Sequence, residues 1–389
     1  MSTTNPINHV MLKWARTTAG MSVEDAVQKM DRKKVTADIL QAWETGTESP
    51  DYAQLERLAY EVYKRPLAVF FFPKPPVEKT PRQAFRTLPA SQIQRLSPRM
   101  RFLLRQAQAM QMNLEELYGG INPAERQLVR DVPFSLDAPV DELGRSVRQF
   151  LAVTLNQQVR WHSPEEAFKA WRAALETHGV FVFKDAFKEE GISGFCLHDT
   201  RSPLIYVNNS RPHTHQVFTL FHELSHLLSG TGGIDTLDEA YIQELHGRNK
   251  QIEVLCNRFA SEFLVPDADF ARSMARLPVN QQSVAVLAER YWVSREVILR
   301  RMRDRQLVTQ QVYEQWSKEW QQELHGRAGS GGDYYLTKGA YLGDHYLELV
   351  FSRLYHNRIT VEQLAEYLGI KTKSVPGMEA LLFQRGATA

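Results

Sequence analysis

The sequence predicts a mostly helical chain with a small α+β domain near its middle. Apolar residues recur at spacings of three and four in the N-terminal quarter and the C-terminal third, which is the period of amphipathic helices. Three short apolar runs at residues 180–183, 192–198 and 204–207 read instead as strands. A strong helical pattern follows at residues 217–230, so helices flank the predicted strands along the chain.

Length and composition are those of an ordinary globular protein. The 389 residues allow two or three domains, and 43% hydrophobic with 24% charged residues is typical of soluble chains. The net charge of +2 gives no electrostatic reason to expect nucleic-acid binding. The sequence has no signal peptide pattern and no apolar run long enough to cross a membrane, and Cys196 and Cys256 make no disulfide framework. We therefore expect a cytoplasmic protein with no membrane contact.

The first 76 residues are expected to form a bundle of short helices. Ser22 is a suitable N-cap for one helix, and a second short helix follows from residue 35. A helix, a tight turn and a second helix that ends in Trp43, Glu44 and Gly46 resemble the Xre-type helix-turn-helix of phage-repressor-like regulators.

That resemblance implies DNA binding through the second helix. The side chains expected to face the major groove are Thr36, Ala37, Asp38 and Gln41. Lys33 and Lys34 in the turn could hold phosphates. The reading face has no Arg or Lys, and residues 1–80 carry 11 basic and 10 acidic residues, a net +1. The alternative is a helical module that docks a protein partner.

Residues 77–145 are expected to be a helical connector. Ser97 and Pro98 are an N-cap and first-turn pair for a long helix that ends near Gly119. Residues 81–130 hold eight Arg and three Glu, a net +5, which we interpret as a solvated face. Extension of a DNA footprint by this charge is a hypothesis.

The helical pattern at residues 217–230 contains H-E-x-x-H at His222, Glu223 and His226. Helical residues four apart return to nearly the same face, so both imidazoles can bind one metal ion. Glu223 lies about a third of a turn away, where a base could take a proton from the attacking water.

A catalytic zinc site needs a third protein ligand. Residues 251–266 read as a helix with one apolar side, and Glu253 lies beside that side, where a solitary carboxylate is costly unless it is paired or binds metal. Asn257, one turn later, could hydrogen-bond a ligand. Cys256 could ligate instead, although a free Cys on an apolar helix is more often simply buried, and Glu262 is expected to be an exposed charge. We choose Glu253, with zinc or another divalent cation bound.

Residues 171–266 resemble the ImmA/IrrE family of metallopeptidases. The resembling stretches are L-E-T-H-G-V-F-V-F, G-F-C-L-H-D, P-L-I-Y-V-N-N, F-T-L-F-H-E-L-S-H-L-L and E-V-L-C-N-R-F-A-S-E-F-L-V-P. The resemblance implies a zincin-like domain in which His222, His226 and Glu253 bind zinc and Glu223 is the base. Leu255 and Cys256 stand where many members carry Glu and Ala, and neither departure removes a ligand.

Two finer expectations concern the substrate. If residues 204–208 form a sheet edge beside the metal, an extended peptide could pair with them. A residue that stabilises the oxyanion cannot be chosen from the sequence among four candidates, which are His213, His215, Tyr241 and His246.

The remaining third of the chain is expected to be helical. Residues 281–307 and 357–373 each have the residue pattern of a helix-turn-helix, which we interpret as ordinary helical packing. Residues 325–333 have the composition of a flexible hinge. The expected parts are a helix-turn-helix domain at 1–76, the connector at 77–145, a zincin-like metallopeptidase domain at 146–275, a helical segment at 276–325 and a helical tail at 326–389.

We interpret the chain as a zinc-dependent endopeptidase and transcription regulator that cleaves or controls a partner repressor or antitoxin. The substrate class follows from the resemblance alone. One alternative is a non-catalytic regulator whose peptidase-like domain senses a ligand or partner, and another is a toxin–antitoxin component that acts by binding. The sequence does not define the oligomeric state.

Overall fold

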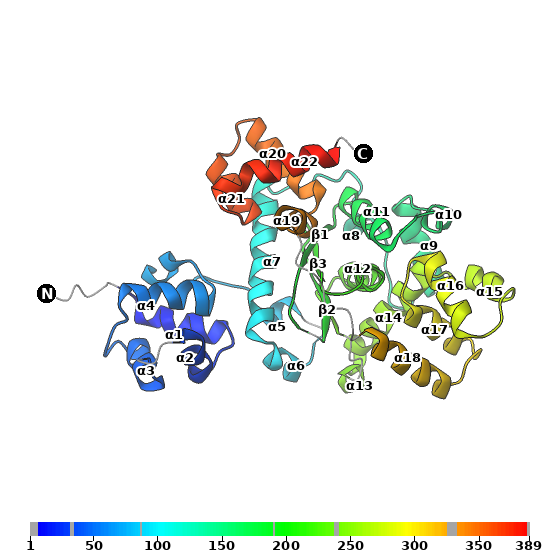
Figure 1. Cartoon of the computed structure of the whole chain (residues 1–389), viewed down its shortest axis with the longest axis horizontal. Helices are drawn as coiled ribbons and strands as arrows, with labels where there is room; N and C mark the ends of the chain where they lie inside the picture. The colour runs from blue at the N-terminus through cyan, green and yellow to red at the C-terminus, as the bar shows by residue number, and fades with distance from the viewer. Residues whose placement is uncertain are drawn as a thin grey trace. The chain divides into compact units, whose positions relative to one another are not determined.

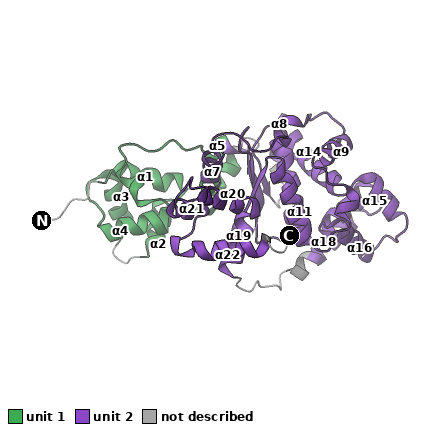
Figure 2. Cartoon of the chain, turned by 90° about the horizontal axis from the view of Figure 1, so that it is seen from above, with its two compact units in different colours: residues 1–83, 90–106 green, residues 84–89, 107–389 purple. Residues whose placement is uncertain are grey.

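A computed structural model of the chain describes residues 7–31, 35–85, 88–189, 191–236, 241–324 and 333–386. Its described part is mostly helical with one four-stranded mixed sheet, which confirms the predicted fold class (Figure 1). The chain divides into two compact units, residues 1–83 with 90–106 and residues 84–89 with 107–389 (Figure 2). None of the described helices is long and apolar enough to cross a membrane. The finer division into five domains and segments stays a prediction from the sequence.

The first unit is a bundle of short helices. It contains α1 (His9–Thr18), α2 (Val23–Met30), α3 (Ala37–Thr45) and α4 (Tyr52–Arg57), followed by a π-helical turn (Leu58–Tyr63) and a 3-10 turn (Leu67–Phe71). Ser22 and Thr36 accept hydrogen bonds from backbone N–H groups and so cap α2 and α3. Side chains from these elements, Trp43 and Phe70 among them, form one apolar core.

Short helices and one long helix connect the bundle to the rest of the chain. They are α5 (Pro81–Ala84), α6 (Ala90–Arg95) and α7 (Pro98–Leu117). The Ser97 hydroxyl accepts from the Met100 N–H at 3.2 Å, so the predicted N-cap of α7 is present. Four further helices, α8 (Leu128–Asp131), α9 (Val140–Phe150), α10 (Leu155–Gln158) and α11 (Pro164–Thr177), then lead to the sheet.

The sheet has the order β1-β3-β2-β4, with β1 (Phe181–Asp185), β2 (Ile192–Leu197), β3 (Leu204–Asn208) and β4 (Ile234–Thr236). Strand β1 runs parallel to β3, whereas β2 runs antiparallel to both β3 and β4. Since β3 is paired on both sides, the hypothesis that it offers a free edge to the substrate is wrong. Within the described residues the outer strand on the β2 side is β4, which the sequence did not predict.

Helices cover both faces of this sheet. Val182, Cys196 and Ile205 point into a core that they share with α11, α12 (His213–Leu228) and α14 (Gly247–Leu264). Phe181 and Phe183 point to the opposite face. There Phe181 packs against Tyr118, which follows α7, and Phe183 packs edge-on against Tyr346 of α20 (Asp344–Tyr355).

The remaining helices belong to the second unit. They are α13 (Tyr241–Glu244), α15 (Asp267–Met274), α16 (Gln281–Tyr291), α17 (Arg295–Asp304), α18 (Gln310–Leu324), α19 (Tyr334–Leu342), α21 (Val361–Leu368), a 3-10 turn (Thr372–Ser374) and α22 (Val375–Gly386). Helices α16, α17 and α18 bury Leu287, Ile298 and Trp320 in the same core as α12 and the sheet. Residues 325–332 of the predicted hinge lie outside the described residues.

Candidate metal centre

Helix α12 carries the two histidines of the motif and is buried along most of its length. Its apolar residues pack into the core, where the Phe221 ring stacks on Phe263 of α14 at a centroid distance of 4.1 Å and meets Trp171 edge-on at 4.9 Å. Gly230, with φ of +73°, follows the helix end, as the sequence predicted. This packing fixes α12, so His222 and His226 project from one side of a rigid element.

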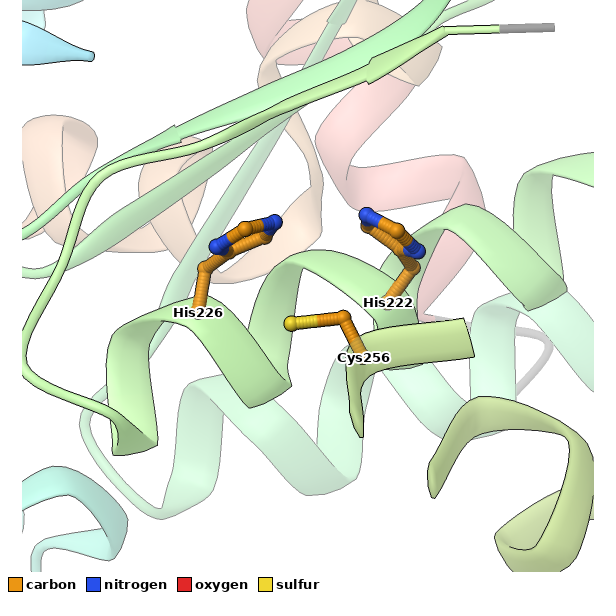
Figure 3. A group of neighbouring side chains, drawn as sticks. All are labelled: His222, His226 and Cys256. Carbon is orange, nitrogen blue, oxygen red and sulfur yellow. The ribbon is translucent and has the colours of Figure 1, made fainter. Parts of the chain in front are cut away.

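Helix α14 supplies the other acidic and polar groups of the site. Glu253 and Cys256 are three residues apart on α14, so they share a face, and that face is turned toward α12. Figure 3 shows Cys256 beside the two imidazoles of α12. The side chains of His226, Glu253 and Cys256 are completely buried, and His222 is buried as well.

The distances fit a shared metal ion. The Glu253 Oε2 lies 3.4 Å from the His226 Nε2 and 3.7 Å from the His222 Nε2. Two ligand atoms that each sit about 2.1 Å from an ion at the tetrahedral angle are about 3.4 Å apart. The structure therefore brings together the three residues that the sequence predicted as ligands.

Hydrogen bonds orient both imidazole rings. The Nδ1 of His222 lies 3.1 Å from the Asn257 Oδ1, which can only accept, so this Nδ1 carries the proton. The Thr231 hydroxyl donates to the His226 carbonyl and lies 3.4 Å from the His226 Nδ1, so it accepts there. In the neutral tautomers that these contacts favour, both Nε2 atoms carry a lone pair. Neither has a hydrogen-bond partner among the described residues, and buried acceptors of this kind suit a cation.

The electrostatics of the cluster also favour positive charge. Burial lowers the pKa of the His226 imidazole, but the Cys256 thiol and the Glu253 carboxyl raise it, and the net direction is well above its usual value. A bound cation would provide the positive charge that these groups stabilise.

Cys256 is a second candidate ligand on α14. Its Sγ and one ring nitrogen each of His222 and His226 all lie within 4.8 Å of one another. The sequence left this residue as an alternative to Glu253, and the structure places both side chains at the cluster.

Glu223 projects from α12 between the two histidines in sequence and is completely buried. Burial raises the pKa of its carboxyl, while the imidazoles of His226 and His222 lower it, and the net direction is upward. A carboxyl with a raised pKa holds a proton nearer to neutral pH, as a general base and acid must.

The other polar residues that the sequence analysis considered do not belong to the cluster of His222, His226, Glu253 and Cys256. The Glu262 side chain is mostly buried and forms an ion pair with Arg301 of α17. The expectation of an exposed charge is therefore wrong, because the partner comes from a distant part of the chain. His215 lies seven residues before His222, about 10 Å along the helix, where it hydrogen-bonds Ser193. His213 packs against Phe168, and His246 is exposed at the start of α14. The side chain of Tyr241 lies outside the described residues.

Two contributors to the site were missed by the sequence reasoning. One is Thr231, which contacts the His226 ring, and the other is Gly233, immediately before β4. A Cβ at Gly233 would lie 2.4 Å from the His226 Cδ2, so only glycine lets the backbone pass against this ring. The paired glycines at 232 and 233 were the available signal of a close backbone approach.

The predicted DNA-contacting residues belong to the first unit. Thr36, which caps α3, and Gln41 are exposed, and Ala37 is partly exposed. Lys33 and Lys34 lie outside the described residues.

Residues 175–303 match the Peptidase_M78 family, described as an IrrE N-terminal-like domain. The matched segment is about a third of the chain and contains the whole sheet, α12 and α14, and hence all the residues of the metal cluster. This similarity supports the ImmA/IrrE resemblance and a possible metallopeptidase. The match does not include the first unit. No curated protein matches the chain.

Proposed function

We propose that the chain is a zinc-dependent endopeptidase whose site consists of His222, His226, Glu253 and Glu223. The observation that carries this proposal is the Glu253 carboxylate, which faces two buried imidazole nitrogens at 3.4 and 3.7 Å. A zinc or other divalent ion held there would polarise the scissile carbonyl and make water more acidic.

Glu223 is the general base of this proposal. Its carboxyl takes a proton from the attacking water and later returns it to the leaving amine, so no net charge accumulates on the protein. Asn257 and Thr231 hold the two imidazoles in the orientation that ligation requires.

Strand β4 is the proposed docking edge for the substrate. Gly233, directly before the strand, lies against the His226 ring, so the strand starts beside the ligands. An extended peptide that pairs with the outer side of β4 would carry its backbone carbonyls past the site. The recognition of backbone rather than one side chain suits an endopeptidase.

The proposed substrate is a partner repressor or antitoxin in the cytoplasm. This choice is supported by the ImmA/IrrE similarity of residues 175–303 and by the helical bundle that precedes it, since a helix-turn-helix module would bring the peptidase to regulatory proteins. The two buried free cysteines suit a reducing compartment.

Cleavage of a co-expressed neighbouring repressor tests this function. Wild type is expected to cut the repressor, and Glu223→Gln is expected to spare it while it still binds metal. Glu165→Gln, at an exposed carboxylate that pairs with Lys169, is the matched control and is expected to cut normally. Equal cleavage by wild type and Glu223→Gln would refute the catalytic role. The non-catalytic alternative predicts an unchanged regulatory phenotype in Glu223→Gln.

A second candidate function is DNA binding through the first unit. It is favoured by the packing of α2 against α3 and by the exposed Thr36 and Gln41 on α3, which is the arrangement that a reading helix needs. In a gel-shift experiment with DNA from upstream of its own gene, wild type is expected to bind, and Thr36→Ala with Gln41→Ala is expected to lose sequence preference. Unchanged preference in the double variant would leave a protein-docking role for this unit.

A further inference from the structure

Cys256 lies where a metal ligand would lie. It follows Glu253 by three residues on α14, so the thiol and the carboxylate leave the helix on the same side. Figure 3 shows the Cys256 side chain beside the two imidazoles of α12, and its Sγ lies within 4.8 Å of a ring nitrogen of each histidine. Tetrahedral zinc would hold sulfur and nitrogen ligands about 3.6 Å apart, so ligation needs only a small closing movement.

A second observation points to the same ion. The Nε2 atoms of His222 and His226 are buried, and no described residue forms a hydrogen bond with them. The two imidazoles thus face the Glu253 carboxylate, at 3.4 and 3.7 Å from their Nε2 atoms, and each also has a ring nitrogen within 4.8 Å of the Cys256 sulfur. Two nitrogens, one oxygen and one sulfur make a complete tetrahedral donor set for zinc.

We propose that Cys256 is the fourth protein ligand, and that its thiolate closes the metal site into a latent state. The proposal rests on the proposed function for the presence of the ion. On ligation the S–H bond breaks, a sulfur lone pair forms the bond to the ion, and the proton leaves to solvent. No electron is transferred, and no co-reactant is needed.

The site would therefore alternate between a closed state with four protein ligands and a catalytic state with three. Closed zinc sites have four protein ligands, whereas catalytic sites have three and an open position. With Cys256 bound, the substrate carbonyl has no place at the ion. Once Cys256 is released, His222, His226 and Glu253 remain as the three-ligand set beside Glu223. Peptide cleavage would therefore require that the substrate, or a partner that presents it, displaces the thiolate.

Cobalt substitution of the full-length protein tests the proposal without an activity assay. A thiolate bound to Co2+ gives a charge-transfer absorption in the near ultraviolet that nitrogen and oxygen ligands do not give. Wild type is expected to bind one Co2+ and to show this band. Cys256→Ala is expected to bind Co2+ at least about tenfold more weakly and without the band.

Cys196→Ala is the matched control, because Cys196 is the only other cysteine and is equally buried. A band retained in Cys196→Ala can come only from Cys256, so this variant assigns the ligand even if Cys256→Ala does not fold. Binding of Co2+ by wild type without the band, or a band that survives in Cys256→Ala, would overturn the proposal. Failure of wild type to bind any Co2+ would instead refute the metal site itself.

Discussion

Asn257 makes a single hydrogen bond that would orient the proposed metal ligand His222. Its Oδ1 accepts from the His222 Nδ1 and so fixes both the tautomer and the ring plane. We expect Asn257→Ala to weaken zinc binding by about ten- to a hundredfold, because the ring loses its orienting acceptor. Asn257→Asp retains the acceptor and is the control. Competition with a chromogenic chelator measures both affinities, and an unchanged affinity in Asn257→Ala would show that packing alone orients the ring.

Lys184 of β1 is expected to make the free energy of unfolding depend on pH. Burial lowers the pKa of its ammonium to about 7, and the Nζ lies 4.3 Å from the centroid of the Phe168 ring. The unfolded chain keeps this lysine protonated up to about pH 10, so between pH 7 and 10 unfolding takes up a proton. Raising the pH in this window therefore favours the folded state, and below pH 7 both states are protonated and the effect is constant.

Lys184→Met should remove this dependence. Between pH 7 and 10 the free energy of unfolding of wild type should rise, relative to the variant, by up to about 1.4 kcal/mol per pH unit. Denaturant unfolding followed by tryptophan fluorescence at several pH values measures the slope. Lys371→Met, at an exposed lysine in another part of the chain, should keep the wild-type slope. Parallel pH profiles for wild type and Lys184→Met would contradict the assigned cause.

Local rules account for the residues that the sequence found. The helical period placed His222 and His226 on one side, and the cost of burying a lone carboxylate selected Glu253. Thr231 and the Glu262–Arg301 pair depend instead on contacts that no local pattern encodes. Arg301 lies 39 residues after Glu262, and nothing in either segment specifies the other as its partner.

The outer strand β4 begins beside the proposed metal ligand His226. Gly233, immediately before β4, lies against His226, and a methyl group there would meet the ring at 2.4 Å from the Cδ2. We expect Gly233→Ala to displace the ring and to weaken zinc binding at least about tenfold. Gly191→Ala is the control, since a Cβ at Gly191 would meet nothing within 4 Å. Equal affinities in the two variants, measured by chelator competition, would refute the close approach.

The positions of helices and strands along the chain follow local patterns and were easier to predict than which elements pack together in space. Helices α7 and α12 begin or end at the caps that the sequence showed, Ser97 and Gly230. Strands β1, β2 and β3 also appeared as apolar runs. The order of the strands in the sheet was not predictable from the sequence. Strand β3 lies between β1 and β2, and such an arrangement depends on packing against α11 and α12 rather than on any local pattern. With only three residues, β4 is too short for a periodic signal.

Each of the two compact units of the whole molecule contains an apolar core of its own, one around Trp43 and one around α12 and the sheet. The metal cluster lies entirely in the second unit. Zinc at a hundred times its dissociation constant should therefore stabilise that unit by about 2.7 kcal/mol, with no effect on the first. Hydrogen exchange with and without a chelator is expected to show faster exchange in α12 and α14 and unchanged exchange in α1 and α3. Uniform changes across both units would contradict this localisation.

The whole account depends on one ion held between two helices of the second unit. The most direct measurement is the zinc content of the purified full-length protein after zinc loading and removal of unbound metal. We predict one zinc per chain for wild type and for Glu223→Gln, and less zinc, bound more weakly, for His226→Ala and for Glu253→Ala. A wild-type protein without zinc, or a Glu253→Ala variant with undiminished zinc and affinity, would contradict the proposed centre.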